Sequence, residues 1–169
     1  SGAWMDELAG RGLLRAGSRR ELFGNRLALI VPRGGGPGSL EALLQPGVRR
    51  VAIGNPDYVP AGIYAKEALV SLGLWPALTG KMLAAVDARA ALAYVERGEA
   101  DCGIVYRSDA AASRSVAIAA LVPVESHSPI RYPAAVLAGS ARSGEALAFV
   151  EFLSTQEARD TWSKHGFEL

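Results

Sequence analysis

The sequence predicts an α/β fold, in which short buried strands alternate with helices. Three short apolar runs are bounded by turn residues, and each is followed by a pattern typical of a helix. The three runs and their helices occupy residues 50–54 and 60–73, 82–86 and 88–98, and 103–106 and 107–112. With 169 residues, half of them apolar, the chain is long enough for one sizeable core or two small lobes.

The composition restricts the class of protein. The 18 basic residues nearly balance the 17 acidic ones and are scattered along the chain, so nucleic acid is not expected as a partner. No apolar run reaches the ~18 residues of a membrane-spanning helix, and no basic-then-apolar leader opens the chain. The protein is therefore expected to be either cytosolic or a mature exported form. Cys102, the only cysteine, excludes an internal disulfide and is expected to pack as a small buried residue.

Three features precede the first of the junctions between a strand and a helix. Residues 1–8 are typical of the end of a helix, and residues 26–32 of a strand. The glycine-rich stretch 33–38 lacks both the Gly-Lys-Ser/Thr ending of a phosphate loop and the GxGxxG spacing, so it is interpreted as a surface turn. Ser39, with Glu41 after it, indicates a short capped helix.

The junction after residues 50–54 is the first candidate for a binding site. Pro60 suits the first position of the helix, where its missing N–H would have no partner. The amides of Ala61, Gly62 and Ile63 are then expected to be the free donors of the helix. The small residues allow a ligand to approach, and the helix dipole favours an anion. Such junctions are also common in α/β proteins that bind nothing there, so both interpretations stand.

The second and third junctions each add a donor. Asp87 is expected to cap the second helix, which leaves the amide of Ala88 as a donor. Arg89, the only obvious cation near these two helix starts, either contacts a ligand or, as is commoner, faces solvent or pairs with Asp87. Tyr106 ends the third strand, where α/β folds place ligands, and its hydroxyl is a neutral donor, although a tyrosine there more often only packs. The caps expected for the short third helix are Ser108 or Asp109.

The last third of the chain contains two strand patterns and two helix patterns. The strands are expected at 116–122 and 132–137, and the helices at 146–153 and about 155–166. His127 lies in the turn between the strands and His165 in the final helix, and neither has a partner at metal-ligand spacing. Both histidines are expected at the surface, and no metal site or cofactor is predicted.

Segments at these junctions and at both ends of the chain form a family pattern. They are Gly54-Asn55-Pro56-Asp57 and residues 59–69 (VPAGIYAKEAL), 90–100 (AALAYVERGEA), 103–110 (GIVYRSDA) and 132–136 (YPAAV), with Trp4-Met5-Asp6, residues 22–27 (LFGNRL) and Gly166-Phe167. Together they closely resemble the periplasmic molybdate-binding proteins of ABC transporters. The resemblance covers nearly the whole chain.

The resemblance implies a type II periplasmic binding protein fold, with two lobes that are each a mixed sheet flanked by helices. Proteins of this kind hold a tetrahedral oxyanion, molybdate or tungstate, in the cleft between the lobes and deliver it to a membrane permease. The family's donors are two backbone amides and a tyrosine hydroxyl, which in this chain correspond to Ala61, Ala88 and Tyr106. The implied protein is periplasmic, is not an enzyme and needs no cofactor.

One departure from the family concerns the first lobe. Family members open with a strand and two serine-bearing loops that supply this lobe's share of the cleft, and nothing in the sequence matches them. The resemblance then assigns residues 1–26 to a partial first lobe, 27–134 to a complete second lobe, and 135–169 to C-terminal helices that return to the first. The 169 residues alone are therefore expected to bind molybdate weakly unless another segment or chain completes the first lobe.

Two other classes of function fit less well. The same fold can serve as the oxyanion-sensing domain of a transcription regulator, but the sequence contains no helix-turn-helix segment. An export signal upstream would separate that alternative from a transport receptor. An enzyme would need a nucleophile with its base, a His or Cys cluster or a carboxylate pair at the junctions, and the sequence has none of these there.

Overall fold

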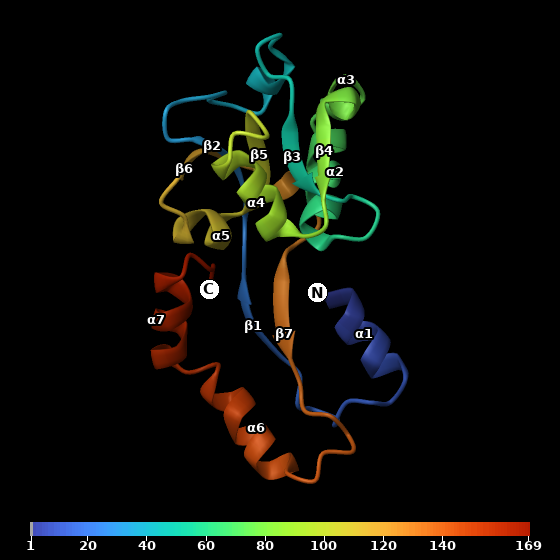
Figure 1. Ribbon diagram of the computed structural model, residues 1–169. Coiled ribbons are helices and arrows are strands. Elements are labelled where there is room, and N and C mark those ends of the chain that lie inside the picture. The colour runs from blue at the N-terminus through green and yellow to red at the C-terminus, as the bar shows by residue number, and fades with distance from the viewer. Residues whose placement is uncertain (1) are drawn as a thin grey trace. The chain divides into compact units, whose positions relative to one another are not determined.

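The computed structural model describes residues 2–169, which form two compact units (Figure 1). Unit 2 comprises Arg26–Pro129, and unit 1 combines the residues up to Asn25 with Ile130–Leu169. The second lobe expected from the sequence extends to Ala134, whereas unit 2 ends at Pro129. The difference arises because strand β7 (Arg131–Ala134) pairs with a strand of unit 1. Within the described residues, no helix is both long enough and apolar enough to cross a membrane.

Unit 2 is built on a five-stranded mixed sheet in the order β4-β3-β5-β2-β6. The strands are β2 (Leu27–Pro32), β3 (Val51–Gly54), β4 (Met82–Ala85), β5 (Cys102–Tyr106) and β6 (Val116–Leu121). Strand β3 runs parallel to β4 and β5, whereas β2 runs antiparallel to β5 and β6. Ile53 lies opposite Ala84 on one side and Ile104 on the other. The carboxyl ends of the three parallel strands therefore share one edge of the sheet.

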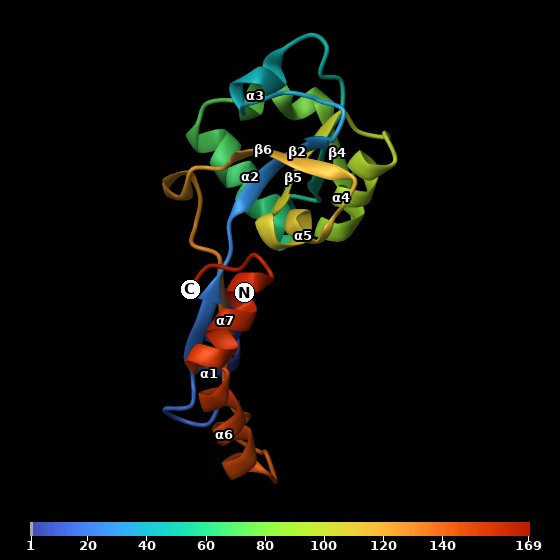
Figure 2. The ribbon, with the colours of Figure 1, turned by 90° about the vertical axis from the view of Figure 1, so that its left-hand side faces the viewer.

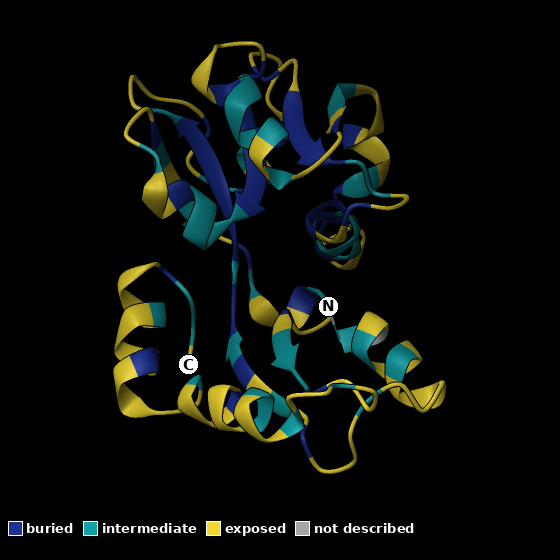
Figure 3. Ribbon diagram, turned by 60° about the horizontal axis from the view of Figure 1, so that its bottom comes forward, coloured by how far each residue is buried: buried dark blue, intermediate teal, exposed yellow. Residues whose placement is uncertain are grey.

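Helices cover both faces of this sheet. Figures 1 and 2 show α2 (Pro60–Ser71) and α4 (Ala88–Glu96) on opposite sides. The shorter elements are α3 (Trp75–Leu78), α5 (Arg107–Ala112) and the 3-10 turns η1 (Glu41–Leu44), η2 (Thr79–Lys81) and η3 (Val124–Ser126). Because both faces are covered, every residue of β3 is buried, and the sequence of such a strand is continuously apolar rather than alternating (Figure 3).

Unit 1 contains a small antiparallel sheet and three helices. The elements are α1 (Gly2–Gly10), β1 (Arg20–Gly24), β7, α6 (Ser143–Phe152) and α7 (Gln156–Lys164), with β1 paired to β7. The sheet is covered by an aromatic cluster in which the Phe23 ring lies 4.9, 4.5 and 4.7 Å from the ring centroids of Tyr132, Trp162 and Phe167. This cluster joins β1, β7 and the C-terminal residues of the chain into one unit.

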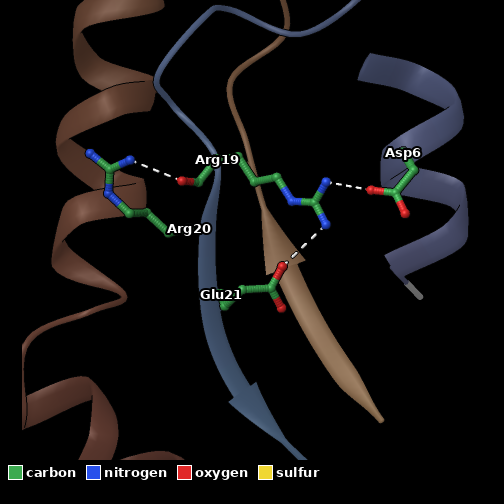
Figure 4. A network of polar contacts seen from close by, with 4 residues as sticks. All are labelled: Asp6, Arg19, Arg20 and Glu21. Atoms are coloured by element: carbon green, nitrogen blue, oxygen red, sulfur yellow. Dashed lines mark hydrogen bonds and ion pairs between the residues drawn. The ribbon is translucent and has the colours of Figure 1, made fainter. Parts of the chain in front are cut away.

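A polar network connects α1 to β1 in unit 1. The Arg19 guanidinium donates hydrogen bonds to the carboxylates of Asp6 and Glu21, and Arg20 donates to the carbonyl oxygen of Arg19 (Figure 4). The side chains of Arg19, Asp6 and Glu21 are exposed to water, which screens their attraction. The network therefore orients α1 rather than providing a core for it.

Candidate functional site

The three donors predicted from the sequence all follow the carboxyl ends of neighbouring parallel strands. Gly54, the last residue of β3, lies opposite Ala85, the last residue of β4. The amide of Asn55 extends this pairing by donating to the carbonyl of Ala85 at 2.7 Å. The first turns of α2 and α4 and the end of β5 are therefore brought to the same edge of the sheet. In open α/β sheets this edge is where ligands bind.

A short turn positions the start of α2 at this edge. Asn55 accepts a hydrogen bond from the amide of Val59 with its carbonyl oxygen at 2.8 Å and from the amide of Asp57 with its side chain at 2.9 Å. Val59 is extended, with φ −90° and ψ 120°, and Pro60 occupies the first helical position as expected. The turn residue Asn55 thus fixes where the helix begins.

The amides at the start of α2 differ from the expected set of three. Ile63 donates to the carbonyl of Val59 at 2.9 Å, so it is part of the helix ladder rather than a free donor. Among the described residues, the amides of Ala61 and Gly62 have no hydrogen-bond acceptor. Ala61 is only 1% exposed. A buried donor without an acceptor costs about 1–3 kcal/mol, so a ligand that accepts from Ala61 would remove a penalty as well as form a bond.

The glycines at this junction serve the packing of the protein itself. A Cβ atom at Gly62 would lie 1.9 Å from the carbonyl oxygen of Gly54, and one at Gly54 would lie 2.5 Å from Cγ1 of Val59. The sequence suggested that small residues here admit a ligand. The structure shows that Gly62 lets the first turn of α2 touch the end of β3, which places the amide of Ala61 directly at the sheet edge.

Helix α4 begins as predicted. Asp87 is extended, and its Oδ1 accepts from the amide of Ala90 at 2.7 Å, while its carbonyl accepts from Ala91 at 3.2 Å. In the described part of the chain, these bonds leave the amides of Ala88 and Arg89 without an acceptor. Ala88 itself is half-buried. The helix therefore presents two backbone donors at its positive end.

The only cation expected near these two helix starts does not pair with Asp87. The Arg89 side chain is 88% exposed, and its Nε lies 4.0 Å from Oδ1 of Asp109 in the first turn of α5. This arrangement fits the expectation that the side chain faces solvent. Its partner could not be identified from sequence because Asp109 is brought near only by the packing of α4 on α5.

Tyr106 lies at the end of β5 and immediately before α5. It pairs with Leu27 of β2, is half-buried, and occupies the capping position of α5 with φ −67° and ψ 140°. Because α5 begins at Arg107, Ser108 and Asp109, the expected caps, lie inside its first turn instead of at the capping position. Tyr106 thus lies at the shared edge of the sheet, where the sequence predicts a ligand donor.

The other titratable groups singled out in the sequence offer little chemistry. Cys102 is buried, and burial raises the pKa of its thiol to about 12, which keeps it protonated. His127 is half-buried rather than at the surface, with Nδ1 2.8 Å from the carbonyl oxygen of Ser128. His165 is exposed as predicted. Within residues 2–169, no cluster of His, Cys, Asp and Glu could hold a metal ion.

Comparisons with known proteins agree with the expected family. Residues 1–168 match the family described as bacterial extracellular solute-binding protein. The chain is 39% identical to the molybdate-binding protein ModA of Escherichia coli over 98% of its own length and 66% of that protein's length. It is 34% identical to the ModA of Haemophilus influenzae, over 99% of its own length and 67% of the relative's.

The fold is also shared with solved structures. A substrate-binding domain assigned to a molybdenum ABC transporter of Clostridium difficile superimposes with a TM-score of 0.88 and 31% identity, over 99% of this chain and 73% of that one. The chain thus spans about two thirds to three quarters of the length of these relatives, and just under two thirds of the Escherichia coli protein.

Proposed function

The chain belongs to the bacterial extracellular solute-binding protein family, and on that premise we propose that it is the molybdate- and tungstate-binding component of an ABC importer. In this proposal it works in the periplasm, holds the oxyanion with backbone amides and a tyrosine hydroxyl, and delivers it to a membrane permease. The relatives named ModA support this ligand, and the family consists of binding proteins rather than enzymes.

The observation that carries the proposal is the position of the three predicted donors at the carboxyl ends of neighbouring strands, on one edge of the sheet. Amides without acceptors begin α2 at Ala61 and α4 at Ala88, and Tyr106 ends the strand on the other side of β3 from β4. The two helices are long enough, at 12 and 9 residues, for their dipoles to favour an anion at these ends.

The energetics explain why several donors are needed. Desolvating a divalent oxyanion costs several kcal/mol even after relaxation. Hydrogen bonds to a charged group contribute about 1.5–3 kcal/mol each, and helix ends add about 0.3–2 kcal/mol each. A site made of such neutral donors ranks anions by fit rather than by attraction to a fixed charge. Molybdate and tungstate, which are nearly equal in size, are therefore expected to bind alike and the smaller sulfate to bind more weakly.

Replacement of Ala88 by proline gives a direct test, because it removes the proposed N–H donor and little else. Proline is favoured at the first position of a helix, and Asp87 before it already has the extended backbone, with ψ 177°, that proline requires. Loss of one hydrogen bond to an anion should weaken molybdate binding by about tenfold or more, measured by isothermal titration calorimetry. Tyr106→Phe should have a similar effect, about 1–2 kcal/mol.

The matched control is Gln156→Pro, which places proline at the first position of α7 after the extended residue Thr155, far along the chain from the donors. It should leave molybdate affinity unchanged. Full affinity in Ala88→Pro would contradict the proposed role of the amide. Equal affinities for molybdate, tungstate and sulfate would contradict selection by size.

We also propose that unit 1 is completed by polypeptide outside these 169 residues. Its two-stranded sheet and its open, largely apolar pocket of about 630 Å³, lined by Leu13, Val136, Leu137 and Ala146, support this. The greater length of the ModA relatives is consistent with it. Co-expression with the part of the Escherichia coli relative that this chain does not match should tighten molybdate binding by about a hundredfold. An unchanged affinity would contradict completion in trans.

A further inference from the structure

Asp109 is a sheltered carboxylate at the edge of the sheet that carries the proposed donors. It lies in the first turn of α5, three residues after Tyr106, and its side chain is only 21% exposed. Its Oδ1 lies 4.0 Å from Nε of Arg89, the residue that follows the proposed donor Ala88. The carboxylate is thus close to the first turn of α4, and its own helix begins at the third donor.

The charges around Asp109 leave it poorly compensated. Helix α5 packs against β2, β5, β6 and α4. The three strands contribute no charged side chain. Helix α4 and its N-terminal cap contribute three charged residues. Arg89 is 88% exposed, so water and salt screen its charge strongly. Glu96 accepts a hydrogen bond from Ser113 at the other end of α5, and Asp87 caps α4. Arg107 is the only other charged residue of α5 itself.

The net effect of these surroundings is to raise the pKa of Asp109. Burial raises the pKa of the carboxyl group, Arg89 opposes the shift, and the like charge of Asp87 adds to it, so that the pKa lies above its ordinary value. A second negative charge placed at the nearby helix start would act in the same direction as Asp87.

We propose that binding of an oxyanion at Ala88 and Tyr106 is coupled to the uptake of a proton by Asp109, which makes this residue a determinant of affinity and of its pH dependence. The inference rests on the proposed function, because it assumes an anion at these donors. An anion raises the pKa of Asp109 further, so by linkage the bound state holds more proton than the free state. Affinity must then fall as the pH rises between the pKa of free Asp109 and that of the bound form.

The test compares the wild-type chain with Asp109→Asn, using molybdate as the probe. Calorimetry at about pH 6 in two buffers of different ionisation enthalpy measures the protons taken up on binding. The wild type should show proton uptake and an affinity that decreases as the pH is raised from there, whereas the variant should show neither. At higher pH the variant should bind on the order of three- to tenfold more tightly, because a like charge has been removed.

Two further variants sharpen the result. Asp57→Asn, an exposed carboxylate in the turn before α2, is the matched control and should keep both the proton uptake and the pH slope of the wild type. Arg89→Gln removes the cation that lies 4.0 Å from Asp109 and opposes its pKa shift, so it should move the pH dependence towards higher pH. The Asp109 carboxyl resonance, followed by NMR in the chain without ligand, should titrate above the ordinary range of an aspartate.

The outcomes separate the two claims. If molybdate binds but the heats are equal in both buffers, or if Asp109→Asn keeps the wild-type pH slope, the role of Asp109 is wrong and the proposed function stands. If Asp109 titrates within the ordinary range of an aspartate, the role of Asp109 is again wrong. Absence of molybdate binding at every pH, also after co-expression with the segment proposed to complete unit 1, would overturn the proposed function, and the coupling with it.

Discussion

Units 1 and 2 belong to one chain but differ in how much apolar surface they bury. In unit 2, every residue of β3 and all but the last residues of β2 and β5 are buried between helices. In unit 1, the buried apolar residues among those described are Leu22, Ile130, Val136, Val150 and Ala158. Several of its large apolar side chains are instead exposed, including Trp4 at 72% and Phe149 at 60%.

The comparison shows that the proposed donors and the core that supports them lie in the same unit. Ala61 and Ala88 depend on α2 and α4, which pack on the sheet of unit 2. Unit 1 has no such sheet and relies on one aromatic cluster around Phe23. Unit 2 should therefore fold as an independent core. Substitutions in that core should lower the free energy of unfolding more than substitutions in unit 1.

The largest difference between the units should appear when each is expressed without the other. Residues 26–129 expressed alone should fold cooperatively, because their two ends are already tied by the hydrogen bond from the amide of Val122 to the carbonyl of Leu27 at 2.9 Å. Residues 2–25 and 130–169 joined by a flexible linker should show little protection from hydrogen exchange, since they bury few apolar residues. Cooperative unfolding of the joined unit 1 would contradict the comparison.

The next largest effect is expected from Gly62→Ala. The new Cβ would lie 1.9 Å from a backbone oxygen, so the helix start must shift and unit 2 should lose about 3–4 kcal/mol of unfolding free energy, measured by urea denaturation. Gly144→Ala in α6 of unit 1 is the matched control, because its Cβ would meet no atom within 4 Å. It should be neutral or slightly stabilising, as alanine favours helices.

Truncation of an apolar side chain should also cost more unfolding free energy in unit 2 than in unit 1. Leu69→Ala removes a fully buried side chain of α2 and should cost about 3 kcal/mol of unfolding free energy. Phe149→Ala removes a side chain that is 60% exposed in unit 1 and should cost less than about 1 kcal/mol in the same urea titration. Equal losses would mean that Phe149 is covered in solution.

A smaller effect is expected at Asp101, whose Oδ2 accepts hydrogen bonds from the amides of Arg49 and Arg50 at 2.8 Å each. Burial opposes ionisation, but these hydrogen bonds and the two arginine charges outweigh it and lower the pKa of Asp101. Because the folded pKa is lowered, the stabilisation is present above the unfolded pKa and is lost as the pH falls through the folded one.

Asp101→Asn should therefore reduce the unfolding free energy at neutral pH by about 0.5 kcal/mol, since water screens most of this group. The difference from the wild type should vanish in acid, which urea titrations at several pH values would show. Asp6→Asn, an exposed carboxylate of unit 1, should change stability still less. A larger effect of Asp6→Asn would mean that unit 1 depends on its surface network.

The sequence was most informative where structure is determined locally. The apolar runs before α2, α4 and α5 and the cap at Asp87 were predicted, because each depends on residues only a few positions apart. Strand β1 was missed, since it is short, half-exposed and stabilised by β7, which follows all of unit 2 in the chain. The role of Gly62 was also misjudged, because it depends on a contact between two elements. Gly62 lies in the first turn of α2 and packs on the carbonyl oxygen of Gly54, at the end of β3.

The site shows the same limit. Ala61, Ala88 and Tyr106 were placed by their family pattern, and the structure brings the ends of the strands before them to one edge. The pairing of Arg89 with Asp109 could not be read from spacing, because it depends on how α4 packs on α5. Interactions between elements, rather than within them, were what the sequence left undetermined.

The insertion of unit 2 between the two halves of unit 1 sets an order of events during synthesis. A ribosome makes β1 before the strands of unit 2, and it must complete all of these before it makes β7, the strand that pairs with β1. Closing that long loop costs little once unit 2 has folded and brought Leu27 beside Val122. Nascent chains should therefore acquire a protease-resistant unit 2 while β1 is still unpaired.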